Sequence, residues 1–145
     1  MILVSACLLG KACKYNGGHN RHAGVLAFLE GKEYLPICPE SLGGLPQPRP
    51  PAEIQPDGRV VDKAGQDVTA AFQRGAQQAL ALAQKYRPEL IILKENSPSC
   101  GCGRVYDGSF SGRTVPGNGI AAQRLLDAGF AVCGESSLPG GTKEG

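Results

Sequence analysis

Three cysteines stand where the chain is predicted to pass from a strand into a loop: Cys7, Cys38 and Cys100. Each follows a short apolar run, and these runs cover residues 2–5, 34–37 and 90–93. Gly, Pro or Ser residues lie within two positions of all three cysteines, so we expect the cysteines on loops rather than in the core. Three thiolates that are distant in sequence but gathered at one place could bind a metal assembly.

The spacing of the cysteines indicates which kind of metal assembly is expected. Zinc motifs usually contain close cysteine pairs with about two to four residues between them. Five residues separate Cys7 from Cys13 and one separates Cys100 from Cys102, so neither pair fits well. An iron–sulfur cluster is larger, reaches ligands on separate loops and suits soft thiolates. If only three cysteines bind, one iron keeps an open position and acts as a Lewis acid.

Two other interpretations of the six cysteines remain open. A structural or interaction module would bind zinc through Cys7, Cys13, Cys100 and Cys102. A thiol redox protein would use Cys100-Gly101-Cys102, although the thioredoxin-like Cys-x-x-Cys motif is absent. Disulfide bonds are not expected in a reducing compartment. Cys133 lies inside an apolar run, so we expect it in the core.

The predicted strands and helices would place the three cysteines at one edge of a sheet. Strands are predicted over residues 2–5, 34–37, 90–93 and 130–133. Helices are predicted over 21–30, from Asp67 as N-cap to the residue before Pro88, and from near Gly119. This alternation predicts an α/β fold, a small three-layer Rossmann-like domain with a mostly parallel four-stranded sheet. Ligands in such sheets bind beyond the carboxyl ends of the strands.

The remaining segments are predicted to be excursions, loops and a tail. The turn at residues 56–58 (PDG) predicts a hairpin from residues 53–55 and 59–62. Residues 43–52 and 94–112 are predicted to be loops without regular structure. A length of 145 residues suits one domain, which we expect at residues 1–135 with a flexible C-terminal tail at 136–145.

Composition and charge narrow the expected partners. The formal net charge is only +2, and no run of Lys and Arg is interleaved with aromatic residues, so nucleic acid is not expected. The apolar start at residues 1–10 has no basic residue before it and is too short to span a bilayer. We therefore expect a cytoplasmic protein without a membrane partner. The sequence does not indicate an oligomeric state.

Several segments of the chain resemble the 2-thiouracil desulfurase family. They lie at residues 5–10 (SACLLG), 13–17 (CKYNG), 38–40 (CPE), 43–45 (GGL), 48–49 (PR), 93–101 (LKENSPSCG), 106–108 (YDG) and 117–119 (GNG). The resemblance implies a [4Fe-4S] cluster on Cys7, Cys38 and Cys100. It also implies a small-molecule substrate, a thiolated pyrimidine, whose sulfur binds the open iron. The implied reaction converts 2-thiouracil to uracil and hydrosulfide without net redox change.

Replacing C=S by C=O requires delivery of water and movement of protons, and nearby polar residues are candidates for these roles. Glu40 lies two residues after Cys38, so its carboxylate could act as general acid or base. Ser97, in a loop stiffened by Pro98, is the second catalytic candidate, because its hydroxyl could relay a proton or hydrogen-bond the ring. The substrate-binding candidates are Ser99, Lys94, Arg49 and Cys13.

Overall fold

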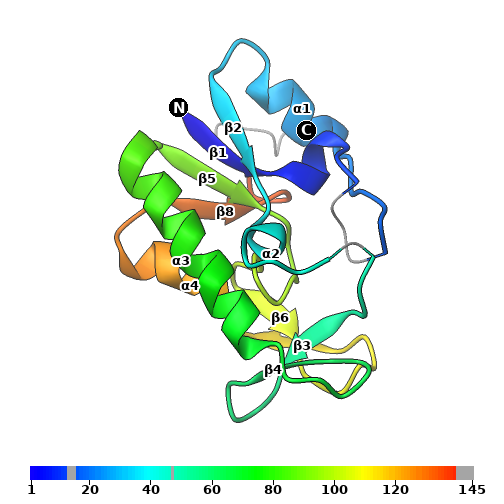
Figure 1. Ribbon diagram of the computed structural model, residues 1–145. Coiled ribbons are helices and arrows are strands. Elements are labelled where there is room, and N and C mark those ends of the chain that lie inside the picture. Colours follow the sequence, from blue (N-terminus) through cyan, green and yellow to red (C-terminus); the bar gives the residue numbers. More distant parts are fainter. Residues whose placement is uncertain (13–15, 47, 140–145) are drawn as a thin grey trace.

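A four-stranded parallel sheet forms the centre of the computed structural model, which describes residues 1–12, 16–46 and 48–139 (Figure 1). The strand order is β2-β1-β5-β8, and each neighbouring pair is parallel. The strands are β1 (Ile2–Ser5), β2 (Tyr34–Ile37), β5 (Leu90–Leu93) and β8 (Val132–Gly134). The predicted α/β fold with a mostly parallel four-stranded sheet is therefore confirmed.

Strand β2 lies at one edge of the sheet and contains a proline. Pro36 is paired with Val4 of β1. Proline cannot donate a ladder hydrogen bond, so it is tolerated in a strand that has a neighbour on one side only. The edge position of β2 explains how Pro36 fits inside a strand.

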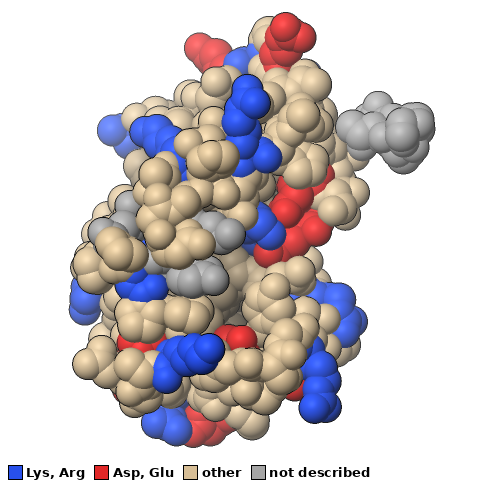
Figure 2. Space-filling model, turned by 90° about the vertical axis from the view of Figure 1, so that its right-hand side faces the viewer, with Lys and Arg blue, Asp and Glu red and all other residues tan. Residues whose placement is uncertain are grey.

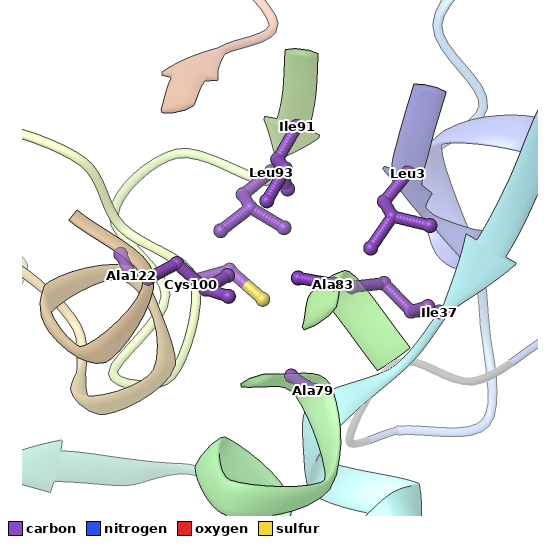
Figure 3. Close-up of a cluster of buried hydrophobic side chains, with 9 residues drawn as sticks. Leu3, Ile37, Ala79, Ala83, Ile91, Leu93, Cys100 and Ala122 are labelled. Atoms are coloured by element: carbon purple, nitrogen blue, oxygen red, sulfur yellow. The ribbon is translucent and has the colours of Figure 1, made fainter. Parts of the chain in front are cut away.

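Helices cover both faces of the sheet. Successive strand residues point to opposite faces. Leu3 of β1 packs into a cluster with residues of α3 (Thr69–Tyr86) and α4 (Ile120–Asp127), whereas Val4 packs against α1 (Ala23–Leu29). Figure 3 shows the first cluster, with Leu3, Ile37, Ala79, Ala83, Ile91, Leu93, Cys100 and Ala122 labelled. The three-layer arrangement follows from these two buried clusters.

The boundaries of three elements differ slightly from the prediction. Helix α3 begins at Thr69 after the N-cap Val68, and the Asp67 carboxylate accepts the Thr69 N–H at 2.9 Å. Helix α1 begins after the N-cap His22, whose Nδ1 accepts the Val25 N–H at 3.1 Å. Strand β8 begins at Val132 rather than at residue 130, because the N–H of residue 130 still bonds a carbonyl at the end of α4.

Two hairpins lie outside the main sheet. The predicted hairpin is confirmed as β3 (Ala52–Ile54) and β4 (Val60–Asp62), which pair antiparallel. A second hairpin, β6 (Arg104–Tyr106) and β7 (Thr114–Pro116), corrects the expectation that residues 94–112 lack regular structure. Its strands have three residues each, and the Arg104 side chain helps to join them by donating to Thr114 Oγ1 at 3.0 Å. A short helix, α2 (Pro39–Leu42), was also not predicted.

The first part of the expected C-terminal tail packs against the domain. Ser136 donates its N–H and its hydroxyl to the Glu95 carboxylate at 2.8 and 2.9 Å, and Leu138 is buried against the cluster on the α1 face. The flexibility of the segment at 136–145 stays a prediction. Residues 140–145 lie outside the described residues, and the boundaries of the single domain stay a prediction.

Positive and negative side chains are mixed on one face of the molecule (Figure 2). Lys and Arg residues on the face drawn in Figure 2 lie in separate groups with acidic residues between them, and this face is hollowed near its middle. No helix among the described residues is both long and apolar enough to cross a membrane.

Candidate metal centre and active site

A cavity of about 430 Å³ lies at the carboxyl edge of the parallel sheet. Its lining includes Cys7 after β1, Cys38 after β2 and Cys100 in the loop that follows β5. Cys7 and Cys100 are buried, and Cys38 is half-buried. The structure therefore brings the three predicted ligands to one cavity. Among the other described cysteines, Cys102 and Cys133 do not line it.

Cys7 is carried by the 3-10 helix η1 (Ala6–Leu9), which directly continues β1. The helix ends at Gly10, whose left-handed φ of 99° lets its N–H turn back to the Cys7 carbonyl at 3.1 Å. Asn20 holds Cys7 twice: its backbone N–H donates to the Cys7 carbonyl at 2.9 Å, and its Nδ2 lies 3.6 Å from Cys7 Sγ. An N–H donated to sulfur stabilises a thiolate, so Asn20 is a site residue that the sequence did not indicate.

Cys38 is the N-cap of α2, and its position depends on close packing between α2 and α3. Pro39 occupies the first helical position, where a missing N–H costs nothing. A Cβ at Gly75 of α3 would overlap the Pro39 carbonyl, and a Cβ at Gly43 would overlap the Ala71 carbonyl. Glycine at both positions therefore sets how closely α2 approaches α3, and with it the position of Cys38.

We expect Gly75→Ala to disturb the site, although alanine favours a helix by about 1 kcal/mol over glycine. The new methyl group would push α2 and Cys38 outward, because the backbone carbonyl of Pro39 cannot give way locally. The free energy of unfolding should fall by about 1–3 kcal/mol, as for other overpacked interiors. Urea denaturation and the iron content after anaerobic reconstitution measure the two effects.

Gln78→Ala, on the exposed side of α3, is the matched control and should leave both quantities unchanged. A Gly75→Ala protein with the stability and iron content of the wild type would contradict this role of the α2–α3 packing.

The loop that carries Cys100 is held by its own turn and by α4. Ser97 Oγ accepts the N–H groups of Ser99 and Cys100 at 3.1 and 3.0 Å. The first N–H groups of α4 donate to carbonyl oxygens of the same loop, and the Ile120 N–H reaches Pro98 O at 2.8 Å. These N–H groups have no partner within their own helix. The start of α4 therefore fixes the loop beside the cavity.

The three thiols and a carboxylate lie within electrostatic reach of one another. Burial raises the pKa of the Cys100 thiol well above its ordinary value, and the negative charges of Glu40, Cys7 and Cys38 raise it further. A hydrogen bond with Ser5 lowers this pKa but does not offset the rise. Without a cation these groups would resist joint ionisation. A bound metal keeps its thiol ligands deprotonated. The donor set therefore fits a positively charged group that contains a soft metal.

The arrangement fits an iron–sulfur cluster better than a single ion. Among the described residues, no three His, Cys, Asp or Glu side chains form a group able to hold one metal ion. The zinc alternative needs Cys102, whose Sγ instead donates to the Val132 carbonyl at 3.7 Å, and Cys13, which lies outside the described residues. Figure 3 shows the sulfur of Cys100 pointing away from Ala122 into the middle of the cluster of buried hydrophobic side chains. Cys100 and Cys102 thus have different surroundings, which also disfavours a redox pair.

Glu40 and Arg49 form a largely buried ion pair that lines the cavity. Arg49 donates to Glu40 Oε1 from Nη2 at 2.6 Å and from Nε at 3.0 Å, and the Arg49 side chain is 6% exposed. Burial raises the pKa of the Glu40 carboxyl, while the charge and hydrogen bonds of Arg49 oppose the rise. The structure thus places Arg49 as a partner of the catalytic candidate, and direct contact with a substrate stays a prediction.

The two serine candidates differ in position. Ser97 lines the cavity, and its hydrogen bond to Glu40 lowers the pKa of that carboxyl. Ser99 is 1% exposed, does not line the cavity, and has a hydroxyl without a hydrogen-bond partner among the described residues. This position does not favour contact with a substrate in the cavity, and the substrate-binding role of Ser99 stays a prediction. Cys13, also predicted to bind substrate, lies outside the described residues.

Lys94 lines the cavity but is already paired. Its Nζ lies 3.1 Å from Glu135 Oε2 and donates to the Glu95 carbonyl at 3.0 Å. Its positive charge is therefore partly neutralised before any substrate binds. A contact between Lys94 and substrate stays a prediction.

Further lining residues come from the two hairpins. Glu53 of β3, Tyr106 of β6 and Phe110 after β6 all line the cavity. None was predicted as a site residue: Tyr106 and Phe110 lie in the segment that was expected to lack regular structure, and Glu53 was expected only in a hairpin outside the main sheet. The signal that could have found this part of the site was the motif at residues 106–108, among the segments that carry the family resemblance.

Comparisons with known proteins show the family to which the chain belongs. A model of the 2-thiouracil desulfurase family matches residues 2–137. The uncharacterized protein YbbK of Bacillus subtilis (strain 168) is 42% identical over 147 residues, which cover 95% of this chain and 97% of that protein. A solved structure, the [4Fe-4S]-dependent thiouracil desulfidase TudS, is 46% identical with a TM-score of 0.87, covering 95% of this chain and 92% of that chain. The chain therefore belongs to the 2-thiouracil desulfurase family.

Proposed function

We propose that this protein is a [4Fe-4S]-dependent enzyme that hydrolyses the thiocarbonyl group of a small thiolated pyrimidine, converting 2-thiouracil to uracil and hydrosulfide. The observation that carries the proposal is the convergence of three buried or half-buried thiols on one cavity that also contains Glu40. The family match and the likeness to TudS support the same cofactor and substrate.

The cofactor and the chain have separate tasks in this reaction. When held by Cys7, Cys38 and Cys100, the cluster supplies an open, soft Lewis-acidic iron for the substrate sulfur. The chain supplies proton transfer. We assign Glu40 as the group that takes a proton from the water that adds to the ring carbon and returns one to the departing sulfur or the ring nitrogen. The products are the oxo base and hydrosulfide, so the reaction needs no external oxidant or reductant.

The neighbours of Glu40 prepare it for this role. Arg49 fixes Oε1, and the Ser97 hydroxyl hydrogen-bonds to the carboxylate from the loop that follows β5. Burial raises the pKa of Glu40, so its proton affinity is closer to that required at neutral pH. The same burial limits the amount of bulk water around the reacting atoms.

We also propose a cytoplasmic location. No disulfide bond joins any two of the described cysteines, as expected for thiols in a reducing compartment. The proposed partner is a small thiolated base.

Anaerobic purification and reconstitution test the proposed function. We expect a brown protein with broad visible absorbance and matched iron and sulfide contents. This protein should release hydrosulfide from 2-thiouracil, whereas the protein without the cluster should not. A screen of other thiolated bases would then define the preferred substrate. A colourless protein with stoichiometric zinc, or a reconstituted cluster protein that releases no hydrosulfide from any thiolated base, would refute the proposal.

A further inference from the structure

Glu53 is a buried carboxylate that the proposed chemistry does not use. It is only 8% exposed and lines the cavity from the β3–β4 hairpin. Its Oε1 accepts the N–H groups of Gly108 and Phe110 at 2.9 and 3.1 Å. Within the described part of the chain, no side chain or backbone group donates a hydrogen bond to Oε2, and no ion pair includes Glu53. The side chain is therefore held through Oε1, and Oε2 keeps its capacity to accept a hydrogen bond from a molecule in the cavity.

We propose that Glu53 recognises the substrate, with Oε2 accepting a hydrogen bond from a ring N–H of the thiolated pyrimidine. This inference rests on the proposed function. A uracil-type ring carries N–H donors beside the carbon that bears sulfur, and binding it in a cavity leaves these donors unpaired unless an acceptor is present. A carboxylate is the strongest acceptor that a protein side chain offers.

The other carboxylates of the cavity are already occupied. Glu40 is held by Arg49 and Ser97. Glu95 accepts hydrogen bonds from Ser136 on both oxygens, at 2.8 and 2.9 Å. Among the described carboxylates that line the cavity, Glu53 therefore has an oxygen to offer to a ring N–H.

The same carboxylate also shapes the aromatic wall of the cavity. Phe110 has a left-handed φ of 57°, which is rare for a bulky side chain, and its N–H is held by Glu53 Oε1. Gly108 has a φ of 95°, and a Cβ there would lie 2.8 Å from the Ile54 carbonyl. Phe110 and Tyr106 line the cavity, and aromatic faces suit a planar heterocycle. Glu53 thus provides the acceptor for an N–H at the edge of the ring and also holds the backbone of Phe110, which would lie beside the face of the ring.

Glu53→Gln separates recognition from a purely structural role. The amide oxygen can still accept the N–H groups of Gly108 and Phe110, so the loop should stay in place. The second position becomes an NH₂ group, which donates and no longer accepts. With the reconstituted holoenzyme and 2-thiouracil, kcat/KM should fall about 10- to 100-fold, because a hydrogen bond to a charged group is lost. Iron content should not change.

Methylated substrates provide the sharper test. N1-methyl-2-thiouracil and N3-methyl-2-thiouracil each remove one ring N–H. In the wild type, the methylation that removes the N–H bound by Glu53 should lower kcat/KM by a similar factor of about 10 to 100. In Glu53→Gln the same methylation should have little further effect, because the interaction is already lost. Anaerobic calorimetry with uracil should show correspondingly weaker binding by the variant.

Asp62→Asn is the matched control. Asp62 is a second buried carboxylate in the same hairpin, and its Oδ1 accepts the N–H groups of Ala64 and Gln66 at 3.0 and 2.9 Å, but it does not line this cavity. Asp62→Asn should change stability at most and should keep the wild-type penalty for methylation.

The outcomes distinguish this inference from the proposed function. If wild-type holoenzyme is active and Glu53→Gln keeps both its kcat/KM and its methylation penalty, the role of Glu53 is wrong while the function stands. If the wild type releases no hydrosulfide, the proposed function fails, and uracil binding then tests the role of Glu53. Equal binding by wild type and variant, or no binding by either, overturns that role.

Discussion

Replacing Cys7, Cys38 or Cys100 singly by serine should lower the iron content of the anaerobically reconstituted protein to that of an untreated sample. The three thiols line one cavity and influence one another electrostatically, so loss of any one leaves an incomplete ligand set. A serine hydroxyl is a harder donor than a thiolate and remains protonated at neutral pH, so it cannot replace the lost ligand. Iron analysis and the visible absorbance spectrum measure the effect.

Cys102 and Cys133 provide matched controls for these substitutions. Both lie outside the cavity lining, and burial raises the pKa of the Cys133 thiol to about 11. Cys102→Ser and Cys133→Ser should therefore keep the cluster, with Cys133→Ser affecting folding at most. Cys13→Ser tests whether the cysteine outside the described residues contributes a ligand or a substrate contact.

Cys100 is buried in the hydrophobic cluster of Figure 3, so its substitution by serine could lower iron content by unfolding the protein as well as by removing a ligand. Burying a hydroxyl without a partner costs about 1–3 kcal/mol. Cys100→Ala avoids this cost and should lose iron to the same extent, with an unchanged far-ultraviolet circular dichroism spectrum. Full iron content in all of the cysteine variants would refute the cluster assignment.

The parallel sheet and its gathering of cysteines could be predicted because the determining signals are local. The apolar runs at residues 2–5 and 90–93 are typical of strands buried on both faces, and the intervening helices require parallel neighbours. Once the strands are parallel, the residues that follow them must share an edge. The positions of Cys7, Cys38 and Cys100 at one cavity follow from this geometry.

The parts that could not be predicted depend on contacts between distant segments. The second hairpin has strands of only three residues, too short for an alternating apolar pattern. The pairing of Arg49 with Glu40 was not predicted, because it depends on the path of the intervening loop. Ser99 follows Ser97 by two residues, yet α4 packs over its carbonyl and buries it. Glu53 meets Phe110 across 57 residues of sequence.

Glu40→Gln should reduce the rate of hydrosulfide release by about 10²- to 10⁴-fold, the usual contribution of a general acid or base. The amide is nearly the same size and its oxygen can still accept from Arg49, but it cannot take up or release a proton at neutral pH. The iron content and the affinity for uracil should stay close to those of the wild type. Single-turnover measurements with the reconstituted enzyme isolate the chemical step from product release.

Glu30→Gln, at an exposed position on the α1 side of the chain, is the control for the substitution itself and should have the wild-type rate. A Glu40→Gln enzyme that holds its full cluster and releases hydrosulfide at the wild-type rate would show that Glu40 is not the proton-transfer group.

The buried ion pair makes a second variant necessary. Glu40→Gln leaves the Arg49 guanidinium, whose side chain is 6% exposed, without its carboxylate partner, and breaking a buried pair in this way can cost about 3–5 kcal/mol of stability. The double variant Glu40→Gln with Arg49→Gln removes the uncompensated charge and should recover much of that stability. It should not recover turnover, because no proton-transfer group returns to the cavity. Recovery of both stability and rate in the double variant would instead mean that Glu40 serves only to neutralise Arg49.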